Sequence, residues 1–152
     1  MDRLLTRNGF SIHREPTCFS DKLRPDGVVQ ASTPLMYDIT YTDSTLTAQQ
    51  RTVTQNLQAH AVAKHHKYDH LAATNGSQFF PLAMDVYGHV HSEFDLFVTT
   101  LSKELKPDKR TPFRRSVFCM IQQATAVGNA RIIMQYHRRL SGVDSSAWAP
   151  RL

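Results

Sequence analysis

Cysteine and long apolar runs are both scarce in this sequence. Its 152 residues include only two cysteines, Cys18 and Cys119, which lie far apart, so the sequence suggests neither a disulfide framework nor a cysteine zinc site. No run approaches the roughly 18 apolar residues that a membrane span needs. The N-terminal residues also lack the continuous apolar core of a signal peptide. We therefore expect no membrane partner and a location in the cytoplasm or the nucleus.

The composition is that of a folded, basic protein. Hydrophobic residues make up 41% and charged residues 20%, which favours a globular chain over a disordered one. A length of 152 residues suits one domain with a substantial core. We expect this domain over residues 1–140, followed by a tail over 141–152. The net charge of +5 favours a nucleic-acid partner, although many basic proteins bind none.

Hydrophobic periodicity and turn residues predict a mixed α/β order. The expected strands cover residues 25–29, 35–41 and 78–88, and the first two are antiparallel to each other. The expected helices cover residues 1–10, 48–70, 89–106 and 113–140, with a basic linker over 106–112. Thr47 with Gln50 fits a capping box for the second helix. Pro81 limits hydrogen bonding in the third strand.

An aspartate and a lysine fall on faces that should be buried. In the strand over 35–41, Asp38 and Thr40 share one face because strand side chains alternate. In the helix over 48–70, Lys64 follows Ala61 by three residues and precedes Tyr68 by four, so it lies in the apolar stripe. A lysine at such a position needs an anionic partner or a chemical role.

These residues are suited to phosphodiester cleavage. That reaction needs a divalent metal held by carboxylates, which neutralises the phosphate and activates an attacking water. Asp26 opens the first expected strand and Asp38 lies on the second, so a hairpin brings them together, and Lys64 can act on the water or the phosphate. Structural explanations also exist, because Pro-Asp-Gly is a common turn and a strand aspartate can cap a neighbour.

In this order the motifs resemble a known family. Arg24-Pro25-Asp26, a strand carrying Asp38, and Ala63-Lys64-x-x-Lys67-Tyr68 resemble the restriction-like endonuclease domain of site-specific non-LTR retrotransposons, a branch of the PD-(D/E)xK nucleases. The resemblance covers about residues 12–100. It implies a mixed central β-sheet flanked by helices, here with a helical C-terminal extension. It also implies a nuclear domain of a larger polyprotein that nicks DNA to prime reverse transcription.

The resemblance assigns the acidic residues to metal binding. Asp26 and Asp38 would hold Mg²⁺ or Mn²⁺, and Glu15, in the first third of the chain, is a candidate for a further acid. The superfamily usually has a lysine two residues after the second acid, where this chain has Thr40. The departure fits members whose catalytic lysine lies on the following helix.

The same resemblance assigns that helix to catalysis. Lys64 would take the place of the catalytic lysine, with Lys67 and Tyr68 supporting the site one turn on. Lys67 is the alternative candidate, because it could contact the scissile phosphate. The assignment of the catalytic lysine between the two stays open at this point.

Histidines and basic residues suggest further contacts. The helix over 48–70 carries His60, His65, His66 and His70, of which the last two form an i, i+4 pair. No glutamate lies between them, so the H-E-x-x-H protease pattern is absent, and we expect these side chains to be mostly solvated. We expect His89 and His91 in a surface loop. A DNA footprint or a solvated basic face would be formed by Lys106, Lys109, Arg110, Arg114, Arg115, Arg131, Arg138 and Arg139.

The sequence thus predicts a Mg²⁺-dependent DNA endonuclease domain of a retrotransposon polyprotein. One alternative is a stand-alone PD-(D/E)xK nuclease of resolvase or repair type. Another is a basic nucleic-acid-binding module whose acidic residues are structural. The nucleases and the binding module differ in one observable, because a nuclease forms a Mg²⁺-dependent cleavage product and the binding module does not.

Overall fold

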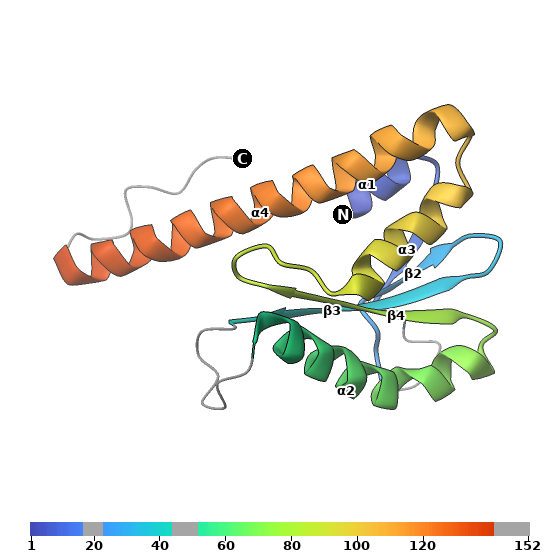
Figure 1. Ribbon diagram of the computed structural model, residues 1–152, viewed down its shortest axis with the longest axis horizontal. Helices are drawn as coiled ribbons and strands as arrows, with labels where there is room; N and C mark the ends of the chain where they lie inside the picture. Colours follow the sequence, from blue (N-terminus) through green and yellow to red (C-terminus); the bar gives the residue numbers. More distant parts are fainter. Residues whose placement is uncertain (17–22, 44–51, 142–152) are drawn as a thin grey trace.

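A four-stranded mixed sheet forms the centre of the computed structural model, which describes residues 1–16, 23–43 and 52–141 (Figure 1). The strands lie in the order β1-β2-β3-β4; β1–β2 and β2–β3 are antiparallel, and β3–β4 is parallel. The elements are α1 (Asp2–Arg7), β1 (Ser11–Arg14), β2 (Gly27–Gln30), β3 (Leu35–Thr42), α2 (Val53–Thr74), β4 (Gln78–Asp85), α3 (Ser92–Lys103) and α4 (Pro107–Ser141).

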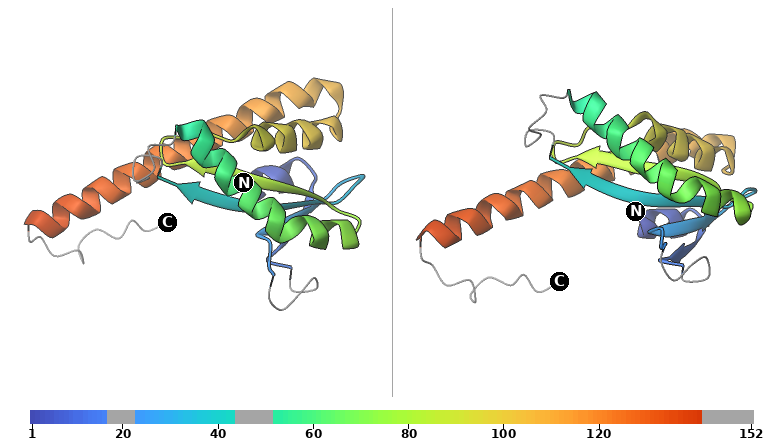
Figure 2. Two further views of the ribbon diagram at one scale, coloured as in Figure 1. Left: turned by 60° about the horizontal axis from the view of Figure 1, so that its bottom comes forward. Right: turned by 90° about the horizontal axis from the view of Figure 1, so that it is seen from below.

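Helices cover both faces of this sheet. α2 lies along one face, and α1, α3 and α4 lie on the other (Figures 1 and 2). The α2 side has a small core of Val28, Met36, Tyr68, Ala72 and Phe79. The opposite side has the larger core, which includes Phe80, Phe94, Phe97, Leu101 and Phe113. The expected mixed α/β fold, a mixed sheet with flanking helices, is therefore confirmed.

Alternation along β3 decides which residues face α2. Leu35 and Tyr37 belong to the larger core, whereas Met36 belongs to the core beneath α2. The expected separation of faces is confirmed, and Asp38 lies on the α2 face with Met36 because side chains two apart on a strand share a face.

The start of α2 differs from the expected one. The helix begins at Val53, and Thr52 is its N-cap in an extended conformation. The Thr52 side chain accepts a hydrogen bond from the Gln55 amide, and the Gln55 side chain accepts one from the Thr52 amide. The expected capping box of Thr47 and Gln50 lies outside the described residues.

One strand was not among the expected elements, and the expected linker over 106–112 was wrong. The sequence around Ser11–Arg14 forms strand β1, because it pairs with β2 from Ser11↔Gln30 to Arg14↔Gly27. The stretch 107–112 is not a linker, since α4 starts at Pro107, where a missing amide hydrogen is tolerated, and continues through Pro112. Burial of Phe113 against the core anchors this first part of the helix. The expected tail after Ser141 lies outside the described residues.

The edge position of β4 explains how it accommodates a proline. Pro81 lies opposite Asp38 in the parallel β3–β4 ladder, and β4 has a single neighbour in the strand order. A strand at the edge tolerates the missing amide hydrogen of proline. In the described part of the chain, no helix combines the length and the apolar character needed to cross a membrane.

Candidate functional site

The β2–β3 register brings the two expected aspartates together. Gly27 pairs with Tyr37, so one step further along the antiparallel ladder Asp26 lies beside Asp38. The Asp26 Oδ2 atom accepts a hydrogen bond of 2.6 Å from the Ile39 amide. Asp26 thus continues the ladder with its side chain just before β2 begins, where β3 runs on beside β4.

The glycine after Asp26 is required by this contact between strands. A Cβ atom at Gly27 would lie 2.5 Å from the Tyr37 hydroxyl oxygen and 2.6 Å from Cζ. The Tyr37 ring therefore packs directly against the Gly27 backbone. Gly27 itself is therefore part of the sheet, because only a residue without a side chain admits this ring.

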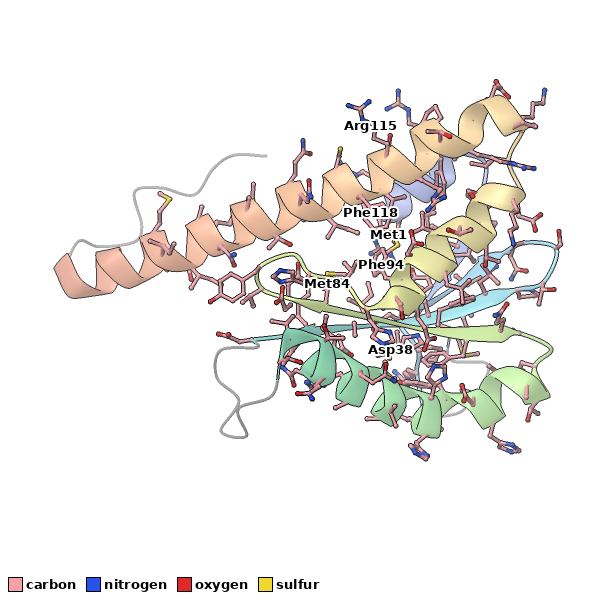
Figure 3. All side chains as sticks on the ribbon, viewed as in Figure 1. Met1, Asp38, Met84, Phe94, Arg115 and Phe118 are labelled. Carbon is pink, nitrogen blue, oxygen red and sulfur yellow. The ribbon has the colours of Figure 1, made fainter. Side chains whose placement is uncertain are left out.

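Asp38 is a buried carboxylate with a charged partner from the opposing helix. It is 4% exposed, and its Oδ2 atom forms an ion pair with Nζ of Lys64 in α2. Figure 3 shows Asp38 between the sheet and α2. A buried carboxylate without a partner would be strongly destabilising. The expectation that Lys64 needs an anionic partner is confirmed, and Asp38 is that partner.

Tyr68 supports this pair one turn further along α2. Its hydroxyl donates a hydrogen bond of 3.0 Å to the Arg24 carbonyl oxygen. Burial, together with the nearby charge of Asp38, raises the pKa of Tyr68 to about 12. Tyr68 therefore stays a neutral proton donor at ordinary pH. The Lys67 ammonium lies 4.7 Å from the Tyr68 ring centroid, a cation–π contact on the exposed side of the helix.

Asp26 is in an environment that disfavours its negative charge. Partial burial raises the pKa of Asp26; the hydrogen bond from the Ile39 amide opposes this rise, and the charge of Asp38 adds to it. The charge of Lys64 lowers the pKa of Asp26 and the charge of Glu15 raises it, and both effects are smaller than that of Asp38. A cation beside Asp26 and Asp38 would relieve this repulsion, because it favours both ionised carboxylates.

Glu15 is near this site through its backbone. Its amide donates a hydrogen bond of 3.1 Å to the Asp26 carbonyl oxygen, and its side chain is exposed. With φ at +41°, Glu15 adopts the left-handed conformation that is unusual for a residue with a side chain. Glu15 thus influences Asp26 through its charge, and the contact between the two residues is made by their backbones.

The donor set fits a cation that shares its coordination with water and substrate. In the described residues, no group of three or more histidine, cysteine, aspartate or glutamate side chains is arranged to hold a metal ion. Asp26 and Asp38 offer two carboxylates, and Mg²⁺ commonly binds through one or two carboxylates together with waters and phosphate oxygens. The pair therefore fits Mg²⁺ or Mn²⁺ as an open site.

Sequence reasoning underestimated two histidines. His65 is bonded at both ring nitrogens, with Nδ1 2.7 Å from Asp69 and Nε2 2.8 Å from Glu93. His91 is buried and caps α3, because its Nδ1 accepts a hydrogen bond from the Glu93 amide. The i, i+4 spacing of His65 and Asp69 was visible in the sequence, whereas Glu93 is 28 residues away and only the fold brings it there.

The basic residues of α4 lie on the other side of the sheet from Lys64. Arg114 pairs with Asp95 of α3 at 3.1 Å, and Arg110 donates to the Leu105 and Lys103 carbonyl oxygens. Figure 3 shows Arg115 pointing away from the sheet. The members of the expected footprint whose side chains the structure describes, from Lys106 to Arg131, are thus exposed, and they do not line the site formed by Asp26 and Asp38.

Comparison with known proteins identifies no family for this chain, so the proposal of a function rests on the geometry of the site. No family model matches this chain, and no curated protein shows significant similarity to it.

Proposed function

We propose that this protein is a metal-dependent DNA endonuclease domain with a restriction-endonuclease-like core. One observation carries the proposal: the Asp26 carboxylate just before β2, the Asp38 carboxylate of the neighbouring β3 and a lysine from the next helix converge at the start of β2. Asp26 contacts the β3 backbone beside Asp38, and Asp38 binds Lys64. The convergence supports a catalytic arrangement because it concentrates negative charge that a cation would neutralise.

Each residue has a distinct role in this proposal. Asp26 and Asp38 would hold Mg²⁺ or Mn²⁺, which when bound supplies charge neutralisation at the phosphate and a lower pKa for the attacking water. Lys64 would orient that water or stabilise the charge on the phosphate. Tyr68 keeps its proton and supports the site through its hydrogen bond to the Arg24 carbonyl oxygen. Lys67 is exposed and would contact a neighbouring phosphate.

The biological setting is proposed on the resemblance of the motifs. The domain would act on nuclear DNA as part of a retrotransposon polyprotein, where a nick primes reverse transcription. The net charge of +5 supports a DNA partner. A stand-alone nuclease of the same superfamily would use the same residues in the same roles.

A second candidate is a basic nucleic-acid-binding module without catalysis. Its support is that Lys64 already neutralises Asp38, so the buried acid is satisfied by the protein itself. In addition, residues 109–141 of α4 contain no aspartate or glutamate. Such a module would bind nucleic acid in a salt-sensitive way and would release no cleaved product.

A plasmid nicking assay in EDTA, Mg²⁺ or Mn²⁺ distinguishes these functions. We expect metal-dependent nicking by the parent and a loss of about 100-fold or more in Asp38→Asn, which removes a metal ligand, and in Lys64→Ala, which removes the cation acting on water or phosphate. Asp38→Asn conserves volume but leaves Lys64 without its anionic partner, so circular dichroism must first show that the variant folds. Asp95→Asn, which changes an exposed acid on α3, is the matched control and should nick like the parent.

The outcomes separate the candidates. Nicking by Asp38→Asn at the parent rate would disprove the assigned site. A folded parent that binds DNA and forms no product with either metal would favour the binding module.

A further inference from the structure

One buried hydroxyl near Asp38 has no hydrogen-bond partner. The Oγ1 atom of Thr40 is buried, and within the described residues nothing donates to it or accepts from it. Most buried polar atoms in proteins are paired, because an unpaired one loses its hydrogen bonds to water without replacement. The Thr40 hydroxyl therefore weakens the fold in the state described here. Such a group calls for a physical explanation.

Thr40 lies between two polar residues that do have partners. Asp38, Thr40 and Thr42 are alternate residues of β3 and so share the face that α2 covers. Lys64 of α2 binds Asp38, and the Asn56 Nδ2 atom donates to Thr42 Oγ1 at 3.1 Å. Only the middle residue of this row has no partner from the helix.

The dimensions of helix and strand place Thr40 within reach of Lys64. From Asn56 to Lys64 the helix rises by about 12 Å, and from Thr42 to Asp38 the strand covers about 13 Å. The two elements thus run antiparallel, with Thr40 opposite the turn that precedes Lys64. Helical side chains lean toward the N-terminus of their helix, so the Lys64 side chain extends toward the level of Thr40.

We propose that Thr40 provides a second position for the Lys64 ammonium. Lys64 bonds to Asp38 when the acid pair holds no cation, and it moves to the Thr40 hydroxyl when a divalent cation binds Asp26 and Asp38. Thr40 is then a positioning residue for the lysine that acts on water or phosphate. This inference rests on the proposed function, since it requires that the acid pair binds a cation.

Electrostatics provides the reason for such a movement. An ammonium group and a divalent cation compete for the same Asp38 carboxylate, and the divalent ion has the stronger attraction. The displaced ammonium has a side chain only 26% exposed, so it would lose a partner in a poorly hydrated place. A threonine hydroxyl can accept a hydrogen bond from one of the three ammonium hydrogens. Thr40 would thus lower the free energy of the cation-bound state.

The test measures thermal unfolding of the protein alone, in EDTA and over a MgCl₂ titration. In EDTA, we expect Thr40→Val to raise the Tm by about 2–4 °C, because it removes an unpaired buried hydroxyl without changing the volume much. The same variant should need about tenfold more Mg²⁺ for the same stabilisation, since the displaced ammonium has lost its acceptor. Thr40→Ser retains the hydroxyl and should restore the Mg²⁺ response of the parent.

Thr42→Val is the matched control on the same face of β3. It leaves the Asn56 amide without its acceptor, so it should lower the Tm in EDTA and leave the Mg²⁺ response unchanged. This pattern is the reverse of that expected for Thr40→Val. A nicking assay on the same variants should follow the Mg²⁺ response and not the Tm.

Two results would overturn the proposal in distinguishable ways. If Mg²⁺ stabilises the parent through Asp26 and Asp38, but Thr40→Val responds to the same Mg²⁺ concentrations, Thr40 has no positioning role and the proposed nuclease stands. If Mg²⁺ neither stabilises the parent nor supports nicking, the cation site itself is absent, and both proposals fall.

Discussion

His65 provides the most direct test of how the helices are held around the sheet edge. Its ring connects α2 to the first turn of α3 by a contact of 2.8 Å to Glu93, and it also contacts Asp69 of its own helix at 2.7 Å. Both partners are carboxylates, which accept hydrogen bonds when ionised, so both ring nitrogens must donate. The geometry thus requires a protonated imidazole. His65→Gln removes this cation while keeping a polar side chain of similar length.

The expected magnitude is set by the exposure of the partners. Glu93 is 24% exposed and joins a different helix, so its contact contributes about 1 kcal/mol. Asp69 is 60% exposed and four residues away on the same helix, so its contact contributes about 0.4 kcal/mol. Loss of both should lower the free energy of unfolding by about 1.4 kcal/mol and the Tm by about 3–6 °C.

The pH dependence has a definite sign. Burial alone would lower the pKa of His65, but the hydrogen bonds with Asp69 and Glu93 outweigh it, so the pKa in the folded protein is raised above 6.5. A raised pKa contributes stability that is complete below the unfolded value near 6.5 and is lost as the pH rises through the folded value. The deficit of His65→Gln should therefore be largest near pH 5.5 and should decrease toward pH 9.

Urea unfolding of parent and variant at several pH values between 5.5 and 9 measures this deficit. His66→Gln is the control, because it changes the neighbouring, exposed histidine on the same helix. Glu93→Gln should reproduce most of the effect of His65→Gln, and the double variant should be less destabilised than the sum of both. A deficit that stays constant or increases with pH would refute the protonated bridge.

Two further predictions concern the elements that build the site. Gly27→Ala should destabilise the fold by about 1–3 kcal/mol, because the new Cβ would overlap the Tyr37 ring; equilibrium unfolding measures this, and a variant as stable as the parent would disprove the close packing. Thr52→Ala should lower the free energy of unfolding by about 1 kcal/mol by removing the α2 cap that pairs with Gln55; helical circular dichroism during urea unfolding is the readout, and an unchanged midpoint would contradict the cap.

Prediction from sequence succeeded where a local pattern decides the structure. The alternation over 35–41 identified the face that carries Asp38, because a strand has no freedom to turn one side chain to the other face. The helical spacing of Lys64 likewise indicated a buried-stripe lysine in need of an anion. Both follow from local backbone geometry, because the spacing of residues along a strand or a helix fixes which side chains share a face.

Prediction failed where distant segments supply the stabilisation. Strand β1 is mostly exposed, and its sequence carries no clear strand pattern. It forms a strand because its backbone pairs with that of β2. The stretch 107–112 reads as a linker from its prolines and charges, but the burial of Phe113 on the core extends α4 back to Pro107. Local propensity is weak compared with tertiary contacts in such segments.

The candidate site shows the same division. By itself, the sequence determined that Asp38 lies in an apolar strand and Lys64 in the apolar stripe of a helix, because residue spacing fixes which side chains share a face. Only the tertiary structure decided that they pair with each other, that Asp26 reaches the Ile39 amide, and that the Thr40 Oγ1 atom has no hydrogen-bond partner among the described residues. These contacts depend on the register between β2 and β3 and on the placement of α2 over the sheet. Such register and placement arise from packing between segments far apart in the chain, which no local pattern encodes.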